Sequence, residues 1–333
     1  MTGVDLAKSA MRPAFDAWRE FAGDASSSFA PNALCHMAHP LGDVQGYDAL
    51  WGTAFQPLKS ALPDLERQEF IRIAGRDSDG AMWVGSGGAY AGTWVSDWLG
   101  IPATGRSATM RFHEFYRIED GACVEMQAIW DIPEMMMQAG VWPMAPQLGR
   151  YLHAPAPMTQ DGLGPHDPEL SEASGKHVVD MLMSMIGHPS QGGPEVMELD
   201  RFWHPKFMWY GPCGIGTARG VSEFRRFHQI PFLNAMPDRG QHEDKIQHHY
   251  MSEGTYVGFT GWPNMCQTIS GDGWLGIPPV DKEVTLCSLD FWRVENGLIR
   301  ENWVLVDLLD MYRQIGVDVF ARMEELKWSK GYR

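Results

Sequence analysis

Apolar and polar positions follow two different periods along the chain, and the same order of periods occurs twice. Residues 10–21 carry apolar side chains at helical spacing, which predicts an opening helix, and residues 177–186 repeat that spacing. An aromatic or apolar run around a proline follows each helix, at 29–37 and at 202–210, and predicts a strand.

A second helix is predicted next in each half. It begins after Gly46 or Gly220 and ends near Pro57 or Pro231, because proline interrupts a helical hydrogen-bond ladder.

Strand patterns fill the rest of each half. They are predicted at 69–74, 81–85, 109–118, 123–131, 245–252, 255–259, 284–294 and 298–306. The pairs Asp120-Gly121 and Asn296-Gly297 favour a tight type I′ hairpin between the last two strands of each half. A helix should follow, short at 132–139 and longer at 308–327. Each half is therefore predicted to be α+β, with helices first and an antiparallel meander after them.

The two halves also match residue by residue. Residues 98–141 align with 274–317 at a constant offset of 176, and sixteen of these forty-four positions are identical. A period this long is typical of two domains with separate cores rather than of a solenoid. We place the first domain at 1–160 and the second at 171–333, with a Pro- and Gly-rich connector at 142–170 that runs extended over the surface. Its apolar residues Met144, Leu148 and Tyr151 offer anchors to one domain.

Composition restricts the class of partner. With 44% apolar residues each half has enough to bury, and a net charge of −15 argues against nucleic acid and anionic membrane surfaces. A small neutral or weakly polar ligand fits better. Five scattered cysteines predict reduced, buried thiols. The charged N-terminal segment and the lack of a long apolar run lead us to expect a cytoplasmic protein.

An aspartate ends the last strand of each half. Asp131 and Asp307 share a strand face with apolar neighbours, so partial desolvation would raise the pKa toward the range of a general acid or base. Aspartate is also a favoured N-cap, and a helix follows each of them, so the spacing alone favours a cap. The two roles are compatible.

One histidine distinguishes the halves. His113 lies on the penultimate strand of the first half, where the second has Leu289, which suggests that only one pocket does acid–base chemistry. A satisfied core histidine is an equal alternative. Glu114 and Asp290 have the opposite parity and should face the other side of the sheet.

The remaining candidates would contact a substrate. His36 and its counterpart Tyr210 lie on an early strand, and His228 on a helix of the second half. His36-x-x-His39 resembles a metal pair, but a proline follows and no third ligand is near, so no metal is expected. Tryptophans supply flat contact area for an apolar ligand or, more simply, for a core. Those taken as candidates are Trp98, Trp130, Trp274 and Trp303.

The combined pattern resembles a known family. The order Trp-Leu-Gly-Ile-Pro at 98–102, a strand, Asp120-Gly121, a strand ending in Trp130-Asp131 and then Gln-Ala-Gly at 138–140 is similar to the SnoaL-like polyketide cyclases of the nuclear transport factor 2-like superfamily. The second half resembles it through 301–316. The resemblance implies two tandem cone-shaped α+β domains, each a strongly bent, mostly antiparallel sheet wrapped by helices around an apolar pocket. It also implies that the family's dimer is made within one chain, as a pseudo-dimer.

The resemblance further implies an activity. In such cyclases an aspartate at the end of the last strand is the acid–base group of an intramolecular aldol closure, without metal or cofactor. Asp131 and Asp307 match that position, and His113 is the nearest match to a pocket histidine. The second half departs at 280–282 and at Leu289, which puts its activity in doubt.

Three hypotheses follow. The first is an enzyme of the lyase or isomerase class in which Asp131 moves a proton next to the carbonyl of an apolar substrate, with His36 or a backbone amide near the carbonyl oxygen. The second is a non-catalytic binder of a small hydrophobic ligand. The third is a dehydratase or hydrolase that uses the same aspartate to activate water.

Overall fold

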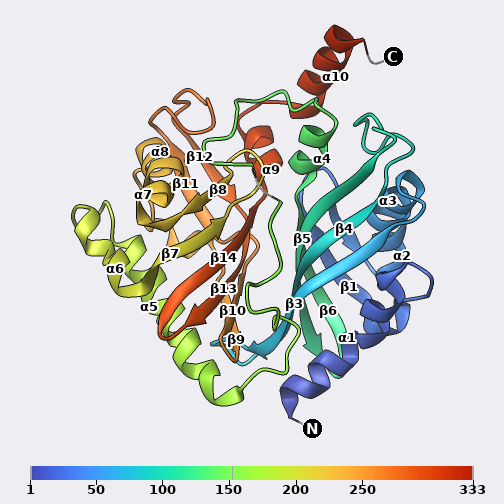
Figure 1. Ribbon diagram of the computed structural model, residues 1–333, viewed down its shortest axis with the longest axis horizontal. Helices are drawn as coiled ribbons and strands as arrows, with labels where there is room; N and C mark the ends of the chain where they lie inside the picture. The colour runs from blue at the N-terminus through green and yellow to red at the C-terminus, as the bar shows by residue number, and fades with distance from the viewer. Residues whose placement is uncertain (1, 152, 332–333) are drawn as a thin grey trace. The chain divides into compact units, whose positions relative to one another are not determined.

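The chain forms two compact α+β units, each built on a six-stranded mixed sheet (Figure 1). The computed structural model describes residues 2–151 and 153–331. The first unit is Met1–Pro143 with Val317–Arg333, and the second is Met144–Gly316. No helix among the described residues is long and apolar enough to cross a membrane.

The units divide the chain differently from the predicted borders. The connector belongs to the second unit because its backbone bonds there: Gly149 N donates to Ile215 O at 2.8 Å, and Arg150 and Thr217 exchange two backbone bonds. The C-terminal helix belongs to the first unit, where Lys327 Nζ donates to Gly100 O at 2.8 Å.

Helix α1 (Gly3–Arg19) packs against the sheet of the first unit, and α10 (Val319–Lys330) extends beyond the ends of the strands (Figure 1). The other helices of this unit are α2 (Tyr47–Leu50), α3 (Gln56–Ala61) and α4 (Ile132–Gln138). The strands are β1 (Phe29–Met37), β2 (Gly42–Gln45), β3 (Glu66–Arg76), β4 (Met82–Thr93), β5 (Ser107–Glu119) and β6 (Ala122–Trp130). Their order is β2-β1-β6-β5-β4-β3, in which β1 runs parallel to β6 and the other pairs are antiparallel. Register shifts in β3–β4 and β5–β6 bend the sheet.

The second unit repeats this plan. Its helices are α5 (Ser171–Ile186), α6 (Leu199–Phe202), α7 (Gly220–Phe224), α8 (Ile230–Ala235) and α9 (Leu308–Gln314). Its strands are β7 (Trp203–Tyr210), β8 (Thr217–Arg219), β9 (His249–Glu253), β10 (Tyr256–Thr260), β11 (Met265–Ile269), β12 (Lys282–Leu286), β13 (Ser288–Glu295) and β14 (Leu298–Val306). The sheet order β8-β7-β14-β13-β10-β9 matches the first, and β11 and β12 form a separate hairpin.

The predicted hairpin turns are confirmed. Asp120 and Gly121 have φ of 47° and 80°, and Asn296 and Gly297 have φ of 51° and 75°. Two successive residues with positive φ are the mark of a type I′ turn, whose twist matches the flanking strands.

The second helix of each half does not end at its proline, contrary to the prediction. A π-helical turn, Trp51–Phe55 or Arg225–Gln229, precedes each proline, and α3 and α8 continue beyond it. Pro57 and Pro231 lie in the first turn of these helices, where a missing N–H is tolerated. The C-terminal helix predicted at 308–327 is likewise two helices, because Gly316 at φ 82° ends α9.

The long strands differ between the units. In the first, β4 and β5 pair without interruption from Met82 to Thr93, whereas the prediction ended this strand at residue 85. Its glycines are not breaks: a Cβ at Gly88 would lie 2.3 Å from the carbonyl oxygen of Gln68, so only glycine fits. In the second unit the same ladder is split into β10–β13 and β11–β12, and the single strand predicted at 284–294 is interrupted at Cys287.

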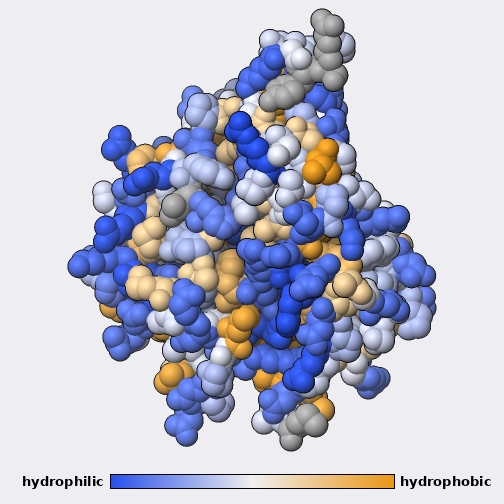
Figure 2. All heavy atoms as spheres, turned by 45° about the vertical axis from the view of Figure 1, so that its right-hand side comes forward, coloured by the Kyte–Doolittle hydropathy of each residue, from blue (hydrophilic) through white to orange (hydrophobic). Residues whose placement is uncertain are grey.

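Apolar side chains fill the interior of both units, and Figure 2 shows a mainly hydrophilic face on which hydrophobic residues are scattered. The five cysteines are free thiols, as predicted, four of them buried and Cys287 partly exposed.

Candidate functional site

A cavity of about 150 Å³ lies inside the second unit. Its helical side is formed by α5 and by the turn that carries His228, and its sheet side by β13 and β14. Apolar and aromatic groups make most of the wall, among them Met181, Phe224 and Trp209. A cavity of this volume in an engineered protein core holds a benzene ring, so a ring-sized apolar ligand fits the scale.

Residues aligned at the offset of 176 explain why the second unit has a cavity at this position. Phe112 and Trp130 of the first unit correspond to Ser288 and Val306, and both of these line the cavity. Two large aromatic side chains are thus replaced by small ones, and the space they would fill remains. Met126 corresponds to Asn302, which adds an amide to the wall.

The interior of the first unit contains a buried carboxylate. Glu114 is fully buried and accepts hydrogen bonds from Arg67 Nη2 at 2.8 Å, from the hydroxyls of Tyr90 and Tyr116 at 2.5 Å each, and from Trp130 Nε1 at 3.0 Å. The Arg67 guanidinium also lies 4.2 Å from the centre of the Phe112 ring. Burial raises the pKa of both tyrosines, so they remain donors to Glu114. At the offset of 176, three members of this network, Glu114, Tyr116 and Trp130, correspond to the cavity-lining residues Asp290, Trp292 and Val306.

Asp290 is the counterpart of Glu114 and lines the cavity. It is 8% exposed, and Ser288 Oγ donates to its Oδ1 at 2.7 Å. The Ser288 backbone is fixed in turn, because its N–H donates to Asn264 Oδ1 at 2.8 Å and its carbonyl accepts from Asn264 Nδ2 at 2.5 Å. The carboxylate is therefore held on a rigid strand at the edge of an apolar space.

A neutral histidine faces the same cavity from the helical side. The His228 ring stacks on Trp209 at 4.3 Å between ring centres, and Phe224 and Phe232 flank it. Burial among these rings, with a smaller effect of Arg239, lowers the pKa of His228 to about 3. The imidazole is uncharged at neutral pH, and it carries one donor and one acceptor nitrogen.

The cavity wall contains several buried polar atoms that have no hydrogen-bond partner within the described part of the chain. They are Nε1 of Trp203, Trp274 and Trp292, Oε1 of Gln267 and Nδ1 of His228. Leaving a buried donor or acceptor unpaired costs about 1–3 kcal/mol, and such groups cluster where a ligand or water supplies the missing bond.

The predicted carboxylates lie elsewhere. Asp307 caps α9, since its Oδ1 accepts from Asp310 N at 3.0 Å, as the cap interpretation expected. Asp131 precedes α4 without capping it through its side chain, and its Oδ2 lies 3.5 Å from Arg111 Nη2. His113 is fully buried on β5, opposite in parity to Glu114 as predicted. None of these three is among the residues that line the cavity described above.

Two of the predicted contact residues, His228 and Trp274, line the cavity. The others lie outside its lining. His36 pairs with Asp43 at 2.9 Å, and Trp130 donates to Glu114. Trp303 donates to Pro155 O at 2.9 Å and packs on Tyr210. Trp98 is buried beside Ile101.

Sequence reasoning singled out Asp131, Asp307 and His113 and did not select Asp290. Strand parity separated Asp290 from Leu289, and Asp290 is the one of the two that lines the cavity. The signal was present in the offset: the groups that bond Glu114 include Tyr116 and Trp130, and at the offset these become Trp292 and Val306. An acid that keeps its position while the residues around it change between the two halves is a candidate for function.

Comparison with known proteins supports two copies of one domain. The family model described as SnoaL-like polyketide cyclase matches residues 11–139 and 193–315. No curated protein matches the chain.

Solved structures each resemble a part of the chain. IdmH from Streptomyces antibioticus is 24% identical over 40% of this chain and 98% of its own, with a TM-score of 0.34. TsrD from Streptomyces laurentii is 19% identical over 42% of this chain and 98% of its own, with a TM-score of 0.35. An NTF2-like protein of unknown function from Burkholderia pseudomallei is 19% identical over 41% and 97%, with a TM-score of 0.32.

The two matched regions together cover most of the chain, and they correspond to the two α+β units. The chain therefore belongs to the SnoaL-like polyketide cyclase family, with two tandem copies of the family domain.

Proposed function

We propose that the cavity of the second unit binds an apolar small molecule with a carbonyl group, and that Asp290 moves a proton at the carbon next to that carbonyl. Family membership supports a small-molecule enzyme of the cyclase or isomerase type. The observation that supports the proposal is a buried carboxylate, Asp290, that lines an apolar cavity and whose Oδ1 accepts a hydrogen bond from Ser288 Oγ.

The chemistry follows from these surroundings. An aspartate in an apolar site is a stronger base than one in water, because desolvation penalises its charge. It takes the proton from the carbon and leaves an enolate, whose oxygen needs a donor. The neutral ring of His228 and the unpartnered indole N–H groups of Trp274 and Trp292 are suited to this, since a neutral donor stabilises an oxyanion without a competing charge.

The test is deuterium exchange in D2O at the carbon next to the carbonyl in a panel of aromatic and cyclic ketones, followed by proton NMR. We expect the wild type to accelerate exchange for a subset of the panel. Asp290→Asn should lower the exchange rate by about 10²- to 10⁴-fold, the usual contribution of a general base, while ligand still quenches the cavity tryptophans.

Asp131→Asn is the matched comparison, because Asp131 is also buried and was the acid predicted from the sequence. If Asp131→Asn abolishes exchange and Asp290→Asn does not, the proposal for Asp290 is wrong and the sequence-based prediction stands. Ligand quenching without exchange in any protein would favour the second candidate, a non-catalytic binder, for which the apolar wall is equally suited.

A further inference from the structure

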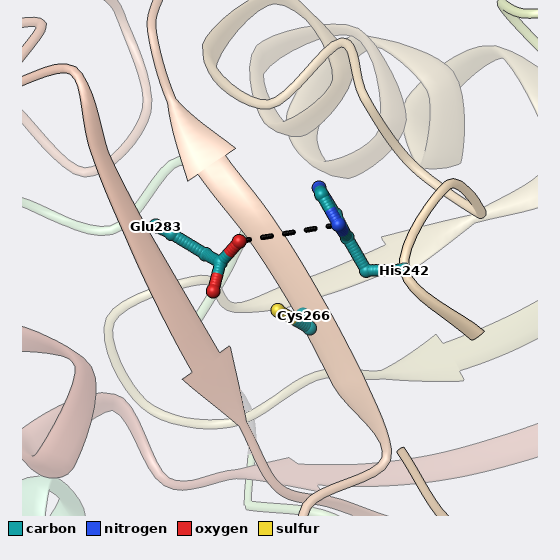
Figure 3. A group of neighbouring side chains, drawn as sticks. All are labelled: His242, Cys266 and Glu283. Carbon is teal, nitrogen blue, oxygen red and sulfur yellow. Dashed lines mark ion pairs between the residues drawn. The ribbon is translucent and has the colours of Figure 1, made fainter. Parts of the chain in front are cut away.

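We infer that His242, Cys266 and Glu283 form a binding site for a zinc-type divalent cation beside the cavity of the second unit. One ligand atom from each lies within 4.8 Å of the others, and Figure 3 shows the three side chains converging from a loop and the two strands of the β11–β12 hairpin. Nitrogen, sulfur and carboxylate oxygen together are the ligand set of Zn²⁺.

The hairpin places two of the ligands on one face. Thr268 of β11 pairs with Glu283 of β12, and Cys266 lies two residues from Thr268, so Cys266 and Glu283 are diagonal neighbours. Cys266 is buried and Glu283 is exposed, so the cluster joins an interior thiol to a carboxylate that solvent can reach. Contraction by about 1 Å would bring the three atoms to the spacing that ligands have around zinc.

A carboxylate already orients the histidine. Asp238 Oδ2 lies 3.1 Å from His242 Nε2. Both Asp238 oxygens also accept from Thr268 N at 2.9 Å, and this bond ties the carboxylate to β11, the strand that carries Cys266. The other ring nitrogen, Nδ1, faces Glu283 at 3.9 Å. A histidine whose second nitrogen donates to a carboxylate is the usual outer-shell arrangement at zinc sites.

One cation competes for the site. Lys245 Nζ lies 2.6 Å from Glu283 Oε2, and its side chain is 42% exposed, so it is free to turn into solvent when another cation binds. Three protein ligands leave a coordination position for water or a substrate oxygen. His242 and Cys266 both line the cavity, so a bound ion would pin the loop before β9 to the hairpin that forms this part of the wall.

The experiment titrates the metal-stripped full-length protein with Co²⁺ and records its absorption. We expect one Co²⁺ per chain, a near-ultraviolet band from thiolate-to-cobalt charge transfer, and loss of that band when Zn²⁺ is added. Cys266→Ser should remove the band and Cys213→Ser, a buried thiol outside the cluster, should keep it.

Two further variants, at the partly buried Asp238 and the exposed Lys245, keep the test decisive if Cys266→Ser does not fold. Asp238→Asn should weaken Co²⁺ binding by about 10- to 100-fold, and Lys245→Ala should tighten it. Absence of the charge-transfer band in the wild type, or its persistence in folded Cys266→Ser, would overturn the inference and reduce the cluster to surface ion pairs. The Co²⁺ titration does not measure deuterium exchange, so the result of the titration is independent of the role of Asp290.

Discussion

The same acidic position has two environments in this chain. Glu114 pairs with Arg67 and accepts hydrogen bonds from tyrosine and tryptophan side chains, whereas Asp290 accepts from a serine hydroxyl and lines a cavity. Removing one partner of a buried ion pair leaves an uncompensated charge, which is the costly case. We therefore expect Glu114→Gln to lower the free energy of unfolding by about 3 kcal/mol and to leave ligand binding in the second unit unchanged. Calorimetry and tryptophan quenching measure the two effects.

Glu119→Gln is the control for this prediction. Glu119 pairs with Arg117 at the surface, where it is 59% exposed, so its loss should change stability by less than about 1 kcal/mol. Equal effects of the two substitutions would show that the Glu114 network is not a structural element of the first unit.

His228 predicts a pH dependence of stability. Its pKa is about 3 in the folded protein and about 6.5 in an unfolded chain, so between these values only the unfolded state binds the proton. Stability is therefore fully present above pH 6.5 and falls as the pH drops toward 3. We expect His228→Phe, which keeps the stacking on Trp209, to remove about 1–2 kcal/mol of the loss between pH 7 and pH 5. Urea titrations of both proteins at the two pH values test this, and parallel losses would contradict it.

At the scale of elements, the sequence predicted the order of helices and strands but not where long strands continue. Alternation and the Asp-Gly and Asn-Gly turns gave the final hairpins with their register. The strand predicted at 81–85 in fact continues through Gly88, where the neighbouring strand approaches so closely that no side chain fits. This requirement for glycine comes from a contact between strands, so the local pattern of apolar and polar residues does not predict it.

Strand β4 therefore gives a prediction of its own. A Cβ at Gly88 would lie 2.3 Å from Gln68 O and 2.7 Å from the Phe112 ring, so Gly88→Ala must displace backbone. We expect a loss of about 1–3 kcal/mol or more in the free energy of unfolding. Gly52→Ala is the control, since a Cβ there meets nothing within 4 Å and lies in a helical turn, so stability should be unchanged or slightly raised. Thermal unfolding of both variants measures the two effects, and equal stabilities would contradict the prediction for Gly88.

Asp307, directly after β14, can be tested as a helix cap against a role as the acid–base group. Asp307 accepts from Asp310 N, so Asp307→Ala should cost about 1 kcal/mol of stability, the usual value of an N-cap. Deuterium exchange by the variant should match the wild type once both are compared well below the unfolding temperature. A loss of exchange without a loss of stability would restore Asp307 as the acid–base group.

At the scale of the whole chain, the repeat predicted two domains and the family fold, and it left open which copy has a working site. The departures of the second copy at 280–282 and at Leu289 put its activity in doubt. The sequence analysis did not weigh two other replacements, Ser288 for Phe112 and Val306 for Trp130, whose small side chains line the cavity. Cavity volume depends on which side chains meet across the fold, so a comparison of single positions did not reveal it.

Exchanging one residue between the two domains tests which domain binds the ligand and catalyses deuterium exchange. Val306→Trp should fill the cavity without touching Asp290, and we expect loss of ligand quenching and of deuterium exchange with stability retained or raised. The reciprocal change, Trp130→Val, empties the first interior and removes a bond to Glu114, so it should cost about 3–5 kcal/mol while exchange persists below the new unfolding temperature. Retained exchange in Val306→Trp together with its loss in folded Trp130→Val would assign the activity to the first copy instead. The pair is informative because each change installs the residue that the other copy already accommodates at the same place in the same fold.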